Sequence, residues 1–218
     1  LAGIAEYFKT PLKVALSGGD GSGDATSAIK GGGQDLTRSA GQVKRTDMNE
    51  ERRRERQVLS KLQQRISMAI ESNPVLRKYK NQLLLEMTPE GLKVQIVDEK
   101  NRPMFDSGSA NLLPHTKDIL HEMGKMFNDV PNRLSVSGHT DATPYVGGER
   151  GYSNWDLSAD RANAARRELL AGGMQDQKIL RVVGLGSANP LDKQNAVNPI
   201  NRRIAIVVLN KQSEEQIL

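Results

Sequence analysis

One stretch in the second half of the chain limits the fold more than any other. Residues 134–138 alternate apolar and small side chains, which is typical of a half-buried strand, and the strand opens into a loop at Asp141. A helix is expected to follow, with Asn154 or Asp156 as its N-cap and with apolar residues at helical spacing until Gly172. A strand followed by a helix of this kind predicts an α/β fold.

The same stretch carries a candidate binding site. Asp141 lies at the strand end and Arg161 lies about one turn into the helix, so the two can bracket a ligand that bears an amine and a carboxylate on one carbon. Each charge-assisted contact contributes roughly 1.5–3 kcal/mol. From spacing alone, an equally good interpretation is a surface Arg161 paired with Asp156 or Asp160, with Asp141 capping a loop.

Taken together, these residues resemble the OmpA-like peptidoglycan-binding family. Its pattern is GHTD at a strand end, N-x-x-LS-x-x-RA on the next helix, and NRR before the last strand. The matching positions here are 138–141, Asn154, Leu157, Ser158, Arg161, Ala162 and 201–203. The resemblance covers roughly residues 90–210. It implies that Asp141 and Arg161 hold the amine and the carboxylate of diaminopimelate in the stem peptide of the cell wall.

Further residues of the motif are expected to shape the pocket. These are Thr140, Asn154, Leu157 and Ser158. One of Arg202 and Arg203 is expected to line the rim, with Arg202 as the candidate, while the other covers sheet surface with its aliphatic stem. Trp155 is expected to anchor the core or a loop rather than to stack on a ligand.

Other segments resemble a narrower group, the wall-anchored stator subunits of the flagellar motor. One is the 142–153 loop, with its additional Pro-Tyr and Gly-Gly pairs, and another is the stretch 101–105. Residues 4–12 resemble the plug of these subunits, which blocks proton leakage before assembly; Ile4, Phe8 and Leu12 form its apolar stripe. The alternative for this short stripe is a frayed terminus.

The stator resemblance implies several partners and a location. It implies peptidoglycan, a channel-forming partner subunit, a homodimer and a contact with the flagellar P-ring. It also implies the periplasmic part of a single-pass inner-membrane protein. The chain starts at Leu1 and has no signal peptide, and no run approaches the ~20 apolar residues of a membrane helix, so we expect a piece of a longer protein.

Composition limits the remaining function classes. Apolar residues make up 37% of the chain and aromatic residues 4%, which suits one domain plus a poorly packed segment. The net charge is +5, but acidic residues are interleaved with the basic ones, so no nucleic-acid partner is predicted. The absence of cysteine from the sequence excludes disulfides and thiolate metal sites.

Five regions are expected along the chain. They are a plug-like segment 1–12, a flexible Gly/Ser-rich linker 13–48, a helical linker 49–82, an OmpA-like domain 83–212 and a tail 213–218. An apolar seam in the helical linker, at Leu59, Leu62 and Ile66, needs a partner surface. That surface is either its own domain or a second copy, and the stator resemblance favours the second copy.

The domain itself is predicted to be a two-layer α/β sandwich, in which a mixed four-stranded sheet carries helices on one face. The expected elements are a hairpin over 83–97, a helix from Pro114, the strand at 134 and its helix, and strands at 180–184 and 204–209. The predicted site then falls at strand ends and a helix start, where open α/β sheets commonly bind ligands.

The leading hypothesis is a non-catalytic peptidoglycan anchor of the flagellar stator, without cofactor or metal. One alternative is a general outer-membrane or lipoprotein anchor of the same family. Another is a cell-wall hydrolase that uses His139, Asp141, Ser153 or Ser158, but no glycine-flanked nucleophile elbow precedes a helix in the sequence. A metal site at His139 and Asp141 lacks evident third and fourth ligands.

Overall fold

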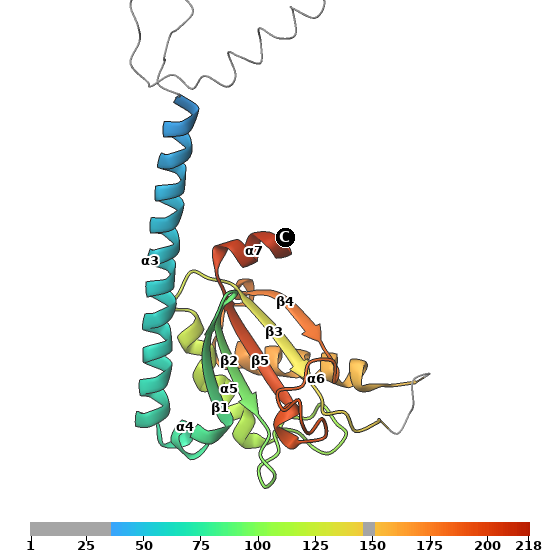
Figure 1. The fold of residues 1–218 in the computed structure, drawn as a ribbon. Coiled ribbons are helices and arrows are strands. Elements are labelled where there is room, and N and C mark those ends of the chain that lie inside the picture. The colour runs from blue at the N-terminus through green and yellow to red at the C-terminus, as the bar shows by residue number, and fades with distance from the viewer. Residues whose placement is uncertain (1–35, 146–150) are drawn as a thin grey trace, which may run out of the picture. The chain divides into compact units, whose positions relative to one another are not determined.

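The computed structural model describes residues 36–145 and 151–218, and for residues 36–47 it describes the helical backbone (Figure 1). The predicted plug residues Ile4, Phe8 and Leu12 therefore lie outside the described residues. Residues 52–218 form one compact unit. Short 3-10 turns apart, the elements in chain order are α3 (Leu36–Ser72), α4 (Pro74–Lys78), β1 (Leu83–Thr88), β2 (Gly91–Val97), α5 (Pro114–Phe127), β3 (Leu134–His139), α6 (Asn154–Ala171), β4 (Ile179–Gly184), β5 (Arg203–Leu209) and α7 (Lys211–Ile217).

The sheet is mixed and has five strands in the order β1-β2-β5-β3-β4. β3 and β4 are parallel, while β5 runs antiparallel to both β2 and β3. The α/β sandwich is confirmed, but the predicted count of four strands is wrong. The segments expected as strands, the two arms of the 83–97 hairpin and those at 134, 180–184 and 204–209, already number five, and all five pair in one sheet.

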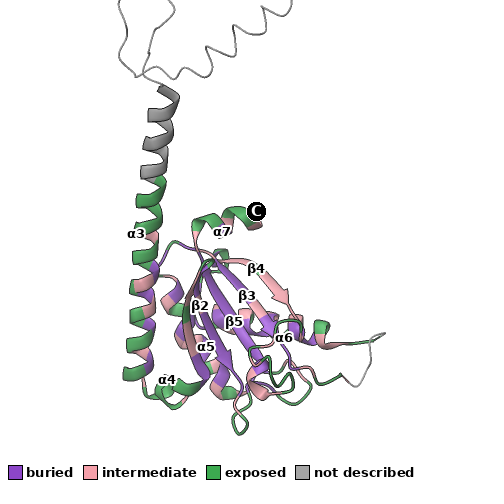
Figure 2. Cartoon of the chain, viewed as in Figure 1, coloured by how far each residue is buried: buried purple, intermediate pink, exposed green. Residues whose placement is uncertain are grey.

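The core lies between the sheet and the helices α5 and α6, which cover one face of it (Figure 1). On β5 every second residue, Ile204, Ile206 and Val208, is fully buried and packs in this core. Figure 2 shows the burial concentrated in the central strands β2, β5 and β3. A core on one face of the sheet leaves the strand ends available for a site.

Helix α3 begins at Leu36 rather than near Asn49, so the last residues of the predicted flexible linker are helical. The run 36–48 contains a single glycine and several good helix formers, which explains the longer helix. No helix in the described ranges combines the length and the apolar character that crossing a membrane requires.

The apolar seam of α3 packs against its own domain. Leu59 and Leu62 are each 2% exposed and Ile66 is fully buried, all within the single chain. Of the two surfaces that the sequence left open, the chain's own core is therefore the one observed. The seam is not available as a dimer contact, so the predicted homodimer loses this basis.

Polar contacts near the chain's C-terminal end also tie α3 to the domain. The Glu55 carboxylate accepts hydrogen bonds from Asn132 Nδ2 at 3.0 Å and from the Lys211 backbone N–H at 2.7 Å. Asn210 caps α7 by accepting from the Ser213 N–H. Most of the residues expected to be a tail thus form a helix.

The burial of the α3 seam yields a stability prediction. Ile66→Ala should lower the free energy of unfolding by about 2–5 kcal/mol, because it leaves a cavity in the core. Met68→Ala on the same helix, at a side chain 61% exposed, should change it by less than about 0.5 kcal/mol. Urea unfolding of both variants measures the difference. Equal stability of the two would show that α3 does not contribute to the core.

Candidate functional site

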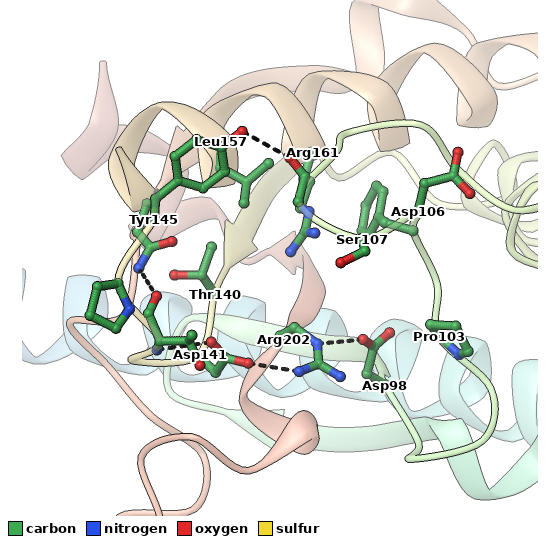
Figure 3. Close-up of a pocket in the computed structure, with 15 residues that line it drawn as sticks. Asp98, Pro103, Asp106, Ser107, Thr140, Asp141, Tyr145, Leu157, Arg161 and Arg202 are labelled. Carbon is green, nitrogen blue, oxygen red and sulfur yellow. Dashed lines mark hydrogen bonds and ion pairs between the residues drawn. The ribbon is translucent and has the colours of Figure 1, made fainter. Parts of the chain in front are cut away.

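A pocket of about 440 Å³ opens where the ends of β2 and β3 meet the start of α6 (Figure 3). Loops after each of these strands form its walls. Its lining residues are Asp98, Pro103, Phe105, Asp106, Ser107, Gly108, Thr140, Asp141, Thr143, Pro144, Tyr145, Asn154, Leu157, Arg161 and Arg202. The structure therefore brings together every predicted ligand-binding residue except Ser158.

The floor of the pocket is an arginine held between two carboxylates. Arg202 Nε donates to Asp98 Oδ2 and Arg202 Nη1 donates to Asp141 Oδ2, both at 2.7 Å. Burial alone would lower the pKa of Arg202, but these two hydrogen bonds raise it above its ordinary value. Arg202 thus stays charged and fixes both carboxylates.

The second oxygen of each carboxylate is held by a backbone N–H. Asp98 Oδ1 accepts from Met104 at 2.6 Å, and Asp141 Oδ1 accepts from Thr143 at 3.0 Å. Burial raises the pKa of Asp98, and its hydrogen bond to Arg202 opposes that shift. Each contact also pins the loop that follows its strand, so the carboxylates set the shape of two walls.

Arg161 crosses the pocket from the helix side. The residue is 5% exposed; its Nε donates to Ser109 O at 3.0 Å and its guanidinium carbon lies 4.6 Å from the centroid of the Phe105 ring. Burial lowers the pKa of Arg161. Within the described part of the chain its terminal nitrogens make no hydrogen bond, and Figure 3 shows them directed into the pocket.

The interpretation of Arg161 as a surface arginine is therefore wrong. Its two expected partners have other contacts: Asp156 accepts from Ser153, and Asp160 accepts from the Tyr152 hydroxyl at 2.5 Å. A buried guanidinium with unused donors is a binding group for an anion, and its fork fits a carboxylate.

The inner charges of the pocket balance. Asp98 and Asp141 oppose Arg161 and Arg202, while Asp106 is exposed at the rim with its carboxylate directed away (Figure 3). Thr140 adds a hydroxyl that is buried and has no hydrogen-bond partner among the described residues. The pocket can thus accept an amine at Asp141 and donate to a carboxylate at Arg161, which is the chemistry of an amino acid head group.

The start of α6 is capped differently from the expectation. The N-cap is Ser153, and the Asp156 carboxylate accepts from the Ser153 backbone N–H at 2.9 Å and from its hydroxyl at 2.6 Å. Asn154 is the first helical residue, and its Nδ2 donates to Thr143 O at 2.9 Å. Asn154 therefore ties the helix to the loop that carries Asp141.

Ser158 lies outside the pocket and holds α6 on the sheet. Its hydroxyl donates to Trp155 O at 2.8 Å and accepts from the Gly186 N–H at 2.9 Å. Next to it, a Cβ on Gly138 would lie 2.1 Å from Ser158 O, so only glycine permits this approach of helix to strand. The contact places Arg161 opposite Asp141.

The sequence also matches known proteins. Residues 104–203 match the OmpA family. The chain is 49% identical over 217 residues to motility protein B of Escherichia coli (strain K12), covering 99% of this chain and 70% of that protein.

The chain belongs to the motility protein B family.

Solved structures of motility protein B relatives share the fold. The periplasmic domain of Helicobacter pylori MotB (residues 90–256) superposes with a TM-score of 0.52 at 22% identity, covering 65% of this chain and 89% of that one. A MotB-like protein of Desulfovibrio vulgaris gives a TM-score of 0.60 at 18% identity, covering 73% and 98%. At these identities the likeness concerns the fold alone.

In this motility protein B family member, sequence reasoning missed Asp98 and Tyr145. Asp98 directly follows β2, and Asp141 lies just beyond β3. Both strands run antiparallel to β5, and Arg202 is the residue just before β5 begins. That strand-end position could have revealed Asp98. Tyr145 closes a wall by donating to Gly108 O at 3.1 Å; residues 146–150, with the Gly-Gly pair, lie outside the described residues.

Arg203 and His139 lie away from the pocket of this motility protein B family member. Arg203 is buried, with Nε donating to Gln95 Oε1 at 3.1 Å and Nη2 to Asn189 O at 2.8 Å, so its guanidinium and not only its stem is covered. Burial lowers the pKa of Arg203 to about 10. His139 contacts the Ser137 hydroxyl at 3.4 Å, and no hydrogen bond to a carboxylate is described for it.

His139 should make the domain sensitive to acid. Its burial, with the charges of Arg203 and Lys93, lowers its pKa from 6.5 to about 3. Below pH 6.5 the unfolded chain therefore binds a proton that the folded chain does not, and stability falls as the pH falls. From pH 7 to pH 5 this residue should account for about 2 kcal/mol of lost stability.

Urea unfolding at the two pH values measures the effect. His139→Gln should remove about 2 kcal/mol of the acid-dependent loss. His121→Gln, at a partly exposed histidine 2.8 Å from Glu168, is the control variant. An unchanged pH dependence in His139→Gln would contradict the prediction.

Proposed function

We propose that this protein is a non-catalytic anchor of the flagellar motor stator that binds peptidoglycan, and that its pocket holds the diaminopimelate of the stem peptide. The observation that carries the proposal is Arg161, a buried guanidinium whose terminal donors point into the pocket across from Asp141. Membership of the motility protein B family supports the stator role.

Ligand and pocket are complementary in charge and geometry. A diaminopimelate side chain ends in an amine and a carboxylate on one carbon, so it is neutral overall, as are the inner charges of the pocket. Its carboxylate accepts hydrogen bonds from the two terminal nitrogens of Arg161. Its amine donates to Asp141, whose Oδ2 is bound by Arg202 and retains acceptor capacity. The Thr140 hydroxyl is a further partner within the same wall.

The alternatives are less well supported. A hydrolase needs a base beside a nucleophile, whereas Ser153 and Ser158 serve the cap and the packing of α6, and His139 lies outside the pocket. A lipoprotein anchor of the same family would use the same pocket, but the identity of 49% is to motility protein B.

The remaining partners belong to the same proposal. They are a channel-forming subunit reached through a membrane helix, a second copy of the chain, and the flagellar P-ring, with the domain in the periplasm. The mass of the chain in sedimentation equilibrium tests the dimer. Cross-linking in motile cells tests the P-ring contact.

Binding to isolated sacculi tests the pocket. Asp141→Asn and Arg161→Lys should each weaken binding by roughly ten- to a hundredfold, since each removes a charge-assisted contact or the bidentate fork. Both should keep a folded domain. Asp176→Asn and Arg167→Lys, at exposed positions, are the matched controls and should bind as the parent chain does. Parent-like binding by both pocket variants would refute the assignment.

The plug proposal has its own test. If residues 1–12 block the channel before assembly, deleting them from the complete subunit, expressed with its channel partner, should acidify the cytoplasm and slow growth. Wall binding by this chain should not change, because the pocket is built from residues 98–202. Normal growth and unchanged cytoplasmic pH would rule out the plug role.

A further inference from the structure

Trp155 is an exposed aromatic residue beside the pocket. It is the only tryptophan of the sequence and is 57% exposed, although a core or loop anchor was the expectation. A side chain of this size usually buries most of its surface. Its exposure therefore needs a reason.

One face of the Trp155 ring packs against Gly186. A Cβ built on Gly186 would lie 3.3 Å from Trp155 Cδ2, 3.5 Å from Cε3 and 3.6 Å from Cε2. The nearest of these is an inner carbon of the fused rings, so Gly186 lies under the face of the indole and not at its edge. A glycine with φ +49° allows this contact at little cost.

Hydrogen bonds connect the backbone of Trp155 to the pocket wall. The Ser158 hydroxyl joins the Trp155 carbonyl to the Gly186 N–H, and the Gly186 carbonyl accepts from Thr140 N at 2.9 Å. Thr140 lines the pocket, as do Asn154 and Leu157 on either side of Trp155 in α6. Trp155 thus lies on the turn of α6 that carries two residues of the pocket wall, and hydrogen bonds join its backbone to a third.

We propose that Trp155 is a second subsite, which stacks on a sugar ring of the glycan strand while the pocket holds the stem peptide. This inference rests on the proposed function. The stem peptide is covalently attached to the glycan, and at about 3.3–3.6 Å per residue a few peptide units reach past the pocket edge. A pyranose ring offers a flat face of C–H groups to the indole and keeps its hydroxyls in water.

The surroundings favour a sugar over an apolar partner. The neighbours of Trp155 in the sequence at the helix start, Ser153, Asn154 and Asp156, are polar. A protein interface would instead be expected to bury a cluster of apolar residues around the tryptophan.

Two soluble probes separate the subsites: a disaccharide-linked stem peptide containing diaminopimelate, and the same peptide without sugars. The chain should bind the glycosylated probe roughly two- to tenfold more tightly. Trp155→Ala should remove this preference and leave the affinity for the bare peptide unchanged. Val197→Ala, at another exposed apolar residue, is the control and should keep the preference. Because Trp155 is the only tryptophan, its fluorescence should shift with the glycosylated probe and much less with the bare peptide.

Each contrary outcome is distinct. A parent chain that binds both probes equally, or a Trp155→Ala variant that keeps the preference, overturns the sugar subsite while leaving the pocket assignment intact. Equal loss of both probes in Trp155→Ala also overturns it, because the ring would then only support the pocket. Failure of the parent chain to bind either probe overturns the proposed function and the subsite with it.

Discussion

The approach of α6 to the end of β3 at Gly138 is the contact on which the rest of the site depends. It lets the helix backbone rest on the strand, and the buried Ser158 hydroxyl then locks the same turn of the helix to Gly186. One turn along α6 lies Arg161, and just beyond the end of β3 lies Asp141. A larger residue at position 138 would separate the two charged groups, whatever their own side chains allow.

Around that contact the pocket is organised before any ligand arrives. Arg202 holds Asp98 and Asp141 in place, and backbone N–H groups hold their second oxygens. Such fixed donors and acceptors reduce the ordering that a ligand must otherwise impose. Phe105 likewise holds Arg161 in place, because the guanidinium lies over the Phe105 ring.

Sequence reasoning reached the α/β sandwich and most of the pocket because local patterns carry that information. The alternation in β3 and β5, the turn of the hairpin, and the GHTD and NRR motifs each act over a few residues. It failed where the answer depends on contacts between distant segments. Asp98 gains its role from Arg202, 104 residues away, and the α3 seam finds its partner in the core of its own domain. Ser158 belongs to the motif, yet its hydroxyl serves packing, which spacing cannot distinguish from binding.

The balance of charge inside the pocket also determines how a ligand finds it. The chain as a whole carries +5, but inside the pocket two guanidiniums face two carboxylates, so these four charges together contribute little field beyond its mouth. Electrostatic steering accelerates association chiefly where one sign of charge dominates, and salt then slows it. Capture here should depend instead on short-range fit, so its rate should vary little with ionic strength and be set by how often the wall comes within contact distance.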